Sequence, residues 1–110
     1  MATYNKEAVE MPAFQIISAV GTARSCYIEA IQEAKKGNYE AAEKMIAEGD
    51  EAFAEGHDAH LGLLGREAET GETDVCLIIL HAEDQLMSAE SFKILANEFI
   101  DVYKEMRKDK

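Results

Sequence analysis

Apolar residues recur at intervals of three and four along almost the whole chain, and only two short breaks interrupt this spacing. Such spacing gathers apolar side chains on one face of an α-helix and is typical of helices packed nearly parallel. The breaks at residues 36–38 and 69–73 leave long segments at about residues 10–36, 39–68 and 74–107. Long helices with short connections predict an all-α, antiparallel up-down-up three-helix bundle that forms one domain over residues 1–110.

The ends of these helices are predicted from residues with defined backbone preferences. Pro12 is tolerated best in a first turn, so we expect the first helix to begin near it, with residues 5–11 forming either a separate turn or a kinked extension. Gly37 suits the position after a helix, and Asn38 and Thr73 suit N-caps. The first apolar stripe comprises Phe14, Ile17, Val20, Ala23, Tyr27, Ile31 and Ala34. The third comprises Val75, Ile79, Ala82, Leu86, Ala89, Phe92, Ala96, Phe99, Tyr103 and Met106.

Residues 76–80 are apolar around the whole circumference of the expected helix, which is more than one core face requires. The run could be read as a buried strand, but the helical spacing continues for nearly thirty residues after it, so we interpret it as helix. A homo-oligomer that buries the additional face is the simplest explanation.

Charge and hydropathy narrow the classes of partner. The chain has 22 acidic and 11 basic residues, a formal net charge of −11. Nucleic acid and anionic lipid require Lys/Arg clusters, so basic proteins or cations are the expected partners. No apolar run approaches the roughly 20 residues of a membrane span, and no signal-peptide core is present, so we expect a cytoplasmic protein with no direct membrane insertion.

Cys26 and Cys76 lack metal-ligand spacing and are expected to be free thiols.

The segment from residue 81 to 87, His-Ala-Glu-Asp-Gln-Leu-Met, carries the candidate chemistry. Residues three and four apart share a helix face, so His81, Asp84 and Gln85 are expected to lie together. The ordinary pKa of histidine, about 6.5, leaves a neutral imidazole with a free lone pair at neutral pH. Taken alone, the segment also allows a packed histidine of purely structural importance.

Residues 80–87 resemble the lactose/cellobiose-type IIA component of the bacterial sugar phosphotransferase system, as do residues 21–25, 54–57 and 64–68. The resemblance covers nearly the whole chain. It implies a trimer of three-helix subunits, which together form a nine-helix bundle. It also implies that a histidine takes a phosphoryl group from the phosphocarrier protein HPr. That group then passes to a cysteine of the IIB component, which phosphorylates a disaccharide entering through the membrane IIC component.

By this match His81 is the phosphoryl acceptor of a phosphotransferase system component. Asp84 matches an aspartate near the three-fold axis that can hold a divalent metal ion, and Mg²⁺ suits such oxygen ligands. Gln85, Ser88 and His57 are candidate hydrogen-bond donors to the phosphoryl group, and a solvated polar face is the alternative for each. Arg24 either pairs with carboxylates of the third helix or lines a partner surface.

The sequence departs from the family pattern at three positions. Glu83 and His60 stand where glutamine is usual, and Gln85 stands where a second histidine is usual. A carboxylate beside a phosphohistidine would repel it, because both groups are negative.

Two other interpretations follow from these departures and from the histidines. The chain could be a helical regulator or adaptor that has lost phosphoryl transfer, or a metal-binding bundle that uses His57, His60, His81 and Asp84. Lactose, cellobiose, chitobiose and other β-linked disaccharides all fit the sequence as the transported sugar.

Overall fold

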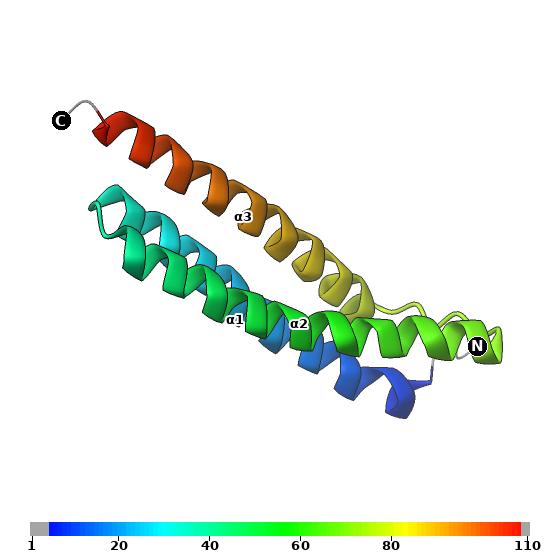
Figure 1. Cartoon of the computed structure of the whole chain (residues 1–110). Coiled ribbons are helices and arrows are strands. Elements are labelled where there is room, and N and C mark those ends of the chain that lie inside the picture. The colour runs from blue at the N-terminus through cyan, green and yellow to red at the C-terminus, as the bar shows by residue number, and fades with distance from the viewer. Residues whose placement is uncertain (1–4, 109–110) are drawn as a thin grey trace.

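A computed structural model describes residues 5–108, and within this range the chain forms three α-helices joined by two short connections (Figure 1). The helices are α1 (Lys6–Lys35), α2 (Tyr39–Thr70) and α3 (Leu77–Arg107). They alternate in direction along a rod of 64 × 19 × 17 Å. The prediction of an all-α, up-down-up three-helix bundle is therefore confirmed.

The first helix is the centre of the packing, because α1 lies along both other helices whereas α2 and α3 touch each other sparsely. Two glycines let α2 approach α1 closely. A Cβ atom on Gly49 would lie 2.6 Å from Cε1 of Tyr27, and one on Gly56 would lie 2.5 Å from Cγ1 of Val20. Side chains on these positions of α2 would push the two helices apart.

The apolar core consists of two clusters along the rod. One cluster contains Ala23, Tyr27, Ala30, Ala34, Ala42, Ile46, Ala96 and Ile100. The other contains Ala13, Ile16, Val20, Ala82, Leu86 and Ala89. The second cluster fixes the first half of α3 against α1, and this is the half that carries His81.

The start of α1 differs from the prediction. The helix begins at Lys6, where the Asn5 side chain accepts a hydrogen bond from the Ala8 backbone N–H at 3.2 Å. Pro12 therefore lies inside the helix, not in its first turn. The expected start near Pro12 was wrong, and of the two alternatives for residues 5–11 the extension of the helix is the one found. Burial of Val9 and Ala13 stabilises the helix on both sides of the proline.

The start of α3 also differs, since the helix begins at Leu77 with Cys76 as its N-cap residue. We expected Thr73 to cap a helix starting at Asp74. Instead Asp74 accepts a hydrogen bond from the Asn5 backbone N–H at 2.8 Å and pairs with Arg66 at 3.4 Å. Asp74 therefore connects the segments before α1 and α3 to the end of α2.

Two further details of the prediction can be compared with the structure. Gly37 has a positive φ of 86°, as expected for the residue after a helix. Asn38 occupies the N-cap position of α2, but its side chain donates to Glu33 and makes no cap hydrogen bond. Four residues of the first and third predicted apolar stripes are exposed instead of buried: Phe14, Val75, Phe99 and Met106.

Both cysteines are free thiols, as predicted, and both are half-buried. Burial, followed by the nearby charge of Glu48, raises the pKa of the Cys26 thiol. Among residues 5–108, no helix combines the length and the hydropathy that a membrane crossing requires.

Candidate functional site

The candidate nucleophile, His81, lies in the second turn of α3 and is exposed to solvent. Its neighbour Ala82 is buried in the core cluster that also contains Leu86 and Ala89. The backbone of this part of α3 is therefore held by packing on one side, while the imidazole is available on another.

The direction in which His81 points follows from two contacts of its neighbours. Ser88, two turns further along α3, accepts a hydrogen bond from Arg24 of α1 at 3.2 Å. Glu83 contacts His60 of α2, with 2.6 Å between Oε1 and Nε2. Two residues along a helix correspond to about 200° of rotation, and seven residues return to nearly the same face. His81 therefore shares the α1 side of α3 with Ser88 and points away from α2.

Asp84 and Gln85 follow His81 by three and four residues in continuous helix, so all three lie on adjoining turns as predicted. Gln85 is half-buried, and its amide can donate hydrogen bonds close to the imidazole. Asp84 is exposed and lies further around α3, on the side away from the core of the protomer.

His57, which was also predicted to donate a hydrogen bond to the phosphoryl group, does not lie beside His81 within one protomer. It is exposed on α2, where its ring stacks on Phe53 with centroids 6.2 Å apart. It precedes His60 by three residues and shares its face of the helix. That face is turned toward Glu83, so His57 lies on the side of α3 from which His81 points away.

Two interactions at the site were not predicted from the sequence. We left the partner of Arg24 open between carboxylates and a partner surface, and in the structure the guanidinium bonds the Ser88 hydroxyl. We expected Glu83 only to repel a phosphoryl group, and in the structure it is paired with His60. Both residues of that pair depart from the family pattern, which was the signal that could have linked them.

The residues proposed for a metal-binding bundle do not converge. Within residues 5–108 of one protomer, no point gathers three or more His, Cys, Asp or Glu side chains in a metal-binding arrangement. The interpretation that His57, His60, His81 and Asp84 form a metal centre inside a single bundle is therefore not supported.

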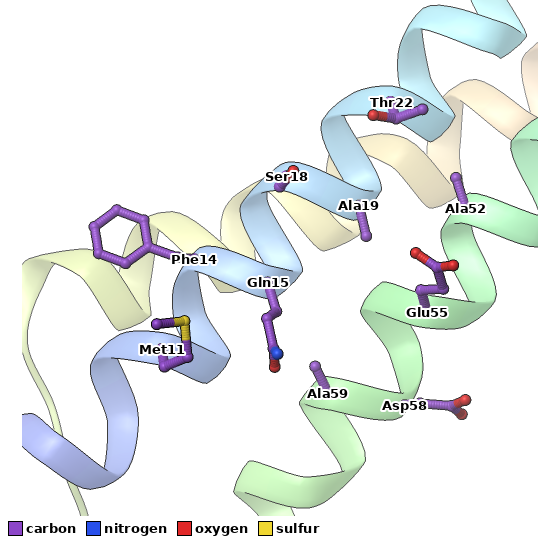
Figure 2. A pocket seen from close by; sticks show the side chains of 10 residues that line it. All are labelled: Met11, Phe14, Gln15, Ser18, Ala19, Thr22, Ala52, Glu55, Asp58 and Ala59. Atoms are coloured by element: carbon purple, nitrogen blue, oxygen red, sulfur yellow. The ribbon is translucent and has the colours of Figure 1, made fainter.

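An open groove of about 830 Å³ runs between α1 and α2, away from His81 (Figure 2). Met11 and Phe14 lie at one end of it, and Gln15 and Glu55 point toward the space between the helices. The groove contains no residue of the His81 segment. The candidate nucleophile lies outside this groove, on an exposed surface of α3.

Comparison with known proteins gives consistent results. Residues 11–104 match the family model described as "PTS system, Lactose/Cellobiose specific IIA subunit". The chain is similar to the oligo-beta-mannoside-specific EIIA component of Bacillus subtilis, with 36% identity over 86% of each protein. It is 32% identical to the lactose-specific EIIA component of Streptococcus mutans, over 91% of this chain and 96% of that protein.

Solved structures agree with the sequence matches. The crystal structure of the PTS cellobiose specific enzyme IIA from Bacillus anthracis superposes with a TM-score of 0.88 and 38% identity. The match covers 92% of this chain and 93% of that one.

Proposed function

Because the chain belongs to the lactose/cellobiose-specific IIA family of the sugar phosphotransferase system, we propose that His81 carries the phosphoryl group. In this proposal HPr donates the group to His81, and a cysteine of the IIB component receives it for a disaccharide that enters through the membrane IIC component. The single observation that carries the proposal is the exposed imidazole of His81 on a packed helix, within the residues that match the family.

The chemistry of such a carrier consists of two displacements at phosphorus. A ring nitrogen of neutral His81, assigned to Nε2 by the family resemblance, forms a bond to phosphorus while the bond to the HPr imidazole breaks. The electron pair of the broken bond returns to the HPr nitrogen. In the second step a IIB thiolate forms the new bond to phosphorus, and the electron pair of the broken P–N bond returns to His81.

Phosphoryl transfer depends mainly on positioning and on stabilising the phosphoryl oxygens. Packing of Ala82, Leu86 and Ala89 supplies a fixed backbone for His81. Gln85, one turn further along, is proposed to donate an amide hydrogen bond to the phosphoryl oxygens. His57 would reach the phosphoryl group only from a neighbouring subunit, because its own protomer holds it on the other side of α3.

The outward surface of α3 supports assembly into a trimer. Leu80, Met87 and Ile94 are each more than half exposed and repeat every seven residues, and Asp84 and Ser91 lie between them. This is the pattern of a helix that packs against other helices along a narrow apolar seam. We propose that three copies meet along α3.

Asp84 would then lie close to the three-fold axis together with its two symmetry mates. Three carboxylates in a partly buried position repel one another unless they are protonated or bridged by a cation. One carboxylate per protomer does not make a metal site, but three oxygen-donor side chains fit a hard divalent ion such as Mg²⁺. The ion would neutralise the axial charge, and no transfer step passes through it.

A phosphorylation experiment tests the proposal. The purified protein is incubated with phosphoenolpyruvate, the first enzyme of the system and HPr, and its intact mass is measured. We expect an acid-labile addition of one phosphoryl group per chain that is absent in His81→Ala. The IIB component should then remove the group and become modified on its cysteine.

Two comparisons sharpen the result. His57→Ala should still accept one phosphoryl group, and slower acceptance would support its proposed contact from a neighbouring subunit. Failure of the folded wild-type protein to accept any phosphoryl group would contradict the proposal and favour a regulator or adaptor built on the same scaffold.

A further inference from the structure

The pair formed by His60 and Glu83 joins α2 to α3 close to the proposed phosphoryl acceptor. Their side chains approach to 2.6 Å between Nε2 and Oε1. The His60 side chain is only 15% exposed, whereas that of Glu83 is 42% exposed. The histidine is therefore the fixed member of the pair, and the carboxylate is the member that could move if its partner were removed.

Glu83 is close to His81 along the backbone of α3, although its side chain contacts His60 of α2. Two residues apart on a helix, their Cα atoms are separated by only about 5 Å, although the side chains leave the helix in nearly opposite directions. A glutamate side chain has three rotatable bonds and exchanges rotamers rapidly when it is partly exposed. In the structure it is bonded to α2, on the side away from His81.

The cost of an unpaired carboxylate here depends on the charge that His81 carries. A phosphoryl group bears between one and two negative charges near neutral pH. A second negative charge several ångströms away disfavours it, and the chain already has a net charge of −11. A group that holds this carboxylate away from His81 is therefore important for how well His81 retains the phosphoryl group.

We propose that His60 is a positioning residue for phosphoryl transfer. It donates its Nε2–H to Glu83 and holds the carboxylate against α2, so that this negative group stays turned away from the phosphoryl group on His81. This inference rests on the proposed function of His81 and adds to it a residue on a different helix.

If the His60–Glu83 pair only stabilised the packing of α2 against α3, a different result would be expected. The ion pairs Lys93–Asp50 and Lys104–Glu43 also join α2 and α3, at 3.2 Å and 3.6 Å. If His60 and Glu83 only held the helices together, their loss would resemble the loss of these other pairs. Their effect on phosphoryl occupancy separates the two explanations.

The test is the equilibrium constant for phosphoryl exchange between HPr and the full-length protein. It is measured from the phosphorylated fraction by intact mass, together with the melting temperature of each variant. His60→Leu, which removes the hydrogen-bond donor, should lower this constant by roughly three- to tenfold, the range expected for one charge several ångströms away in a largely solvated position. Glu83→Gln should leave the constant at or above the wild-type value, because it removes the negative charge.

The double variant His60→Leu/Glu83→Gln decides the question. We expect it to return to the wild-type constant whatever its melting temperature, because the carboxylate that could turn toward His81 is gone. Lys104→Gln serves as the matched control, since it breaks a distant α2–α3 ion pair and should leave the constant unchanged.

Two results would overturn the inference: a His60→Leu constant equal to wild type, or a double variant that remains as low as His60→Leu. Neither would bear on His81 as acceptor, which fails only if the wild-type protein takes up no phosphoryl group.

Discussion

Tyr27 forms the most complete polar connection between the three helices. Its side chain is fully buried, and its ring lies over Gly49 of α2. Its hydroxyl donates to Asp50 of α2 at 2.7 Å, and Lys93 of α3 contacts the same carboxylate oxygen at 3.2 Å. Burial raises the pKa of the Tyr27 hydroxyl, and the hydrogen bond and charge of Asp50 raise it further. The packing therefore favours the neutral phenol.

Tyr27→Phe tests this connection through its pH dependence. Near pH 8 we expect the substitution to lower the free energy of unfolding by about 1 kcal/mol, since one buried hydrogen bond is lost. A raised folded-state pKa contributes stability that is fully present below the unfolded pKa of about 10 and is lost as pH rises above it.

The wild-type advantage should accordingly shrink by about 1.4 kcal/mol for each pH unit above 10 and vanish near pH 11. Urea unfolding of both proteins between pH 8 and pH 11 measures this difference. A difference independent of pH would contradict the assignment of a neutral, hydrogen-bonded phenol.

At the scale of the element, α1 contains Pro12 in its seventh position and continues through it. A proline has no N–H to bond to the carbonyl four residues earlier, which here belongs to Ala8, and its ring crowds that carbonyl. Helix formation across this point is sustained by the burial of Val9 and Ala13 and by the Asn5 cap. Tertiary packing has overridden a local preference for a helix start.

Pro12→Ala should therefore stabilise the protein. Restoring the backbone hydrogen bond is expected to raise the free energy of unfolding by about 1–2 kcal/mol, after allowance for the greater entropy of the unfolded chain without proline. Chemical denaturation at fixed protein concentration checks this. Met11→Ala, at an exposed neighbouring position, is the control and should change stability little. A destabilised Pro12→Ala would show that contacts of the ring outweigh the missing bond.

At the scale of the whole molecule, the three helices cover one another's core-facing sides. The outward face of α3 is not covered by another helix of the same protomer. Leu80 of the apolar run at residues 76–80 lies on that face, and exposed Met87 and Ile94 continue it along α3. The net charge of −11 lies over a surface that basic regions of partner proteins can recognise. Assembly along α3 would leave α1 and α2 on the outside.

Substitutions on the outward α3 face test this arrangement. Ile94→Glu should convert trimers into monomers, because it places three charges in an apolar seam. Asp84→Leu should leave the trimer intact or more stable, since it removes axial repulsion, and it should abolish any rise in melting temperature caused by Mg²⁺. Analytical ultracentrifugation reports the assembly state. Loss of trimers in Asp84→Leu would argue against an axial position for this residue.

The features that the sequence predicted correctly are those that depend on the backbone geometry of a few neighbouring residues. Helix periodicity is set within a few residues, so the three helices, the left-handed Gly37 and the adjoining positions of His81, Asp84 and Gln85 could all be predicted. The family resemblance supplied the expected chemistry of His81, because that information resides in a contiguous motif.

The tertiary structure alone decided which sides of α3 face α1 and α2. That depends on the relative rotation and register of helices, which are set by contacts between residues far apart in the chain. The Arg24–Ser88 bond spans 64 positions and the His60–Glu83 pair spans 23, so neither can be predicted from the spacing of residues within one helix. Other contacts between distant segments moved the start of α3 past Asp74 and carried α1 through Pro12. They did so because burial and pairing between distant segments contribute more free energy than the preferences of single residues.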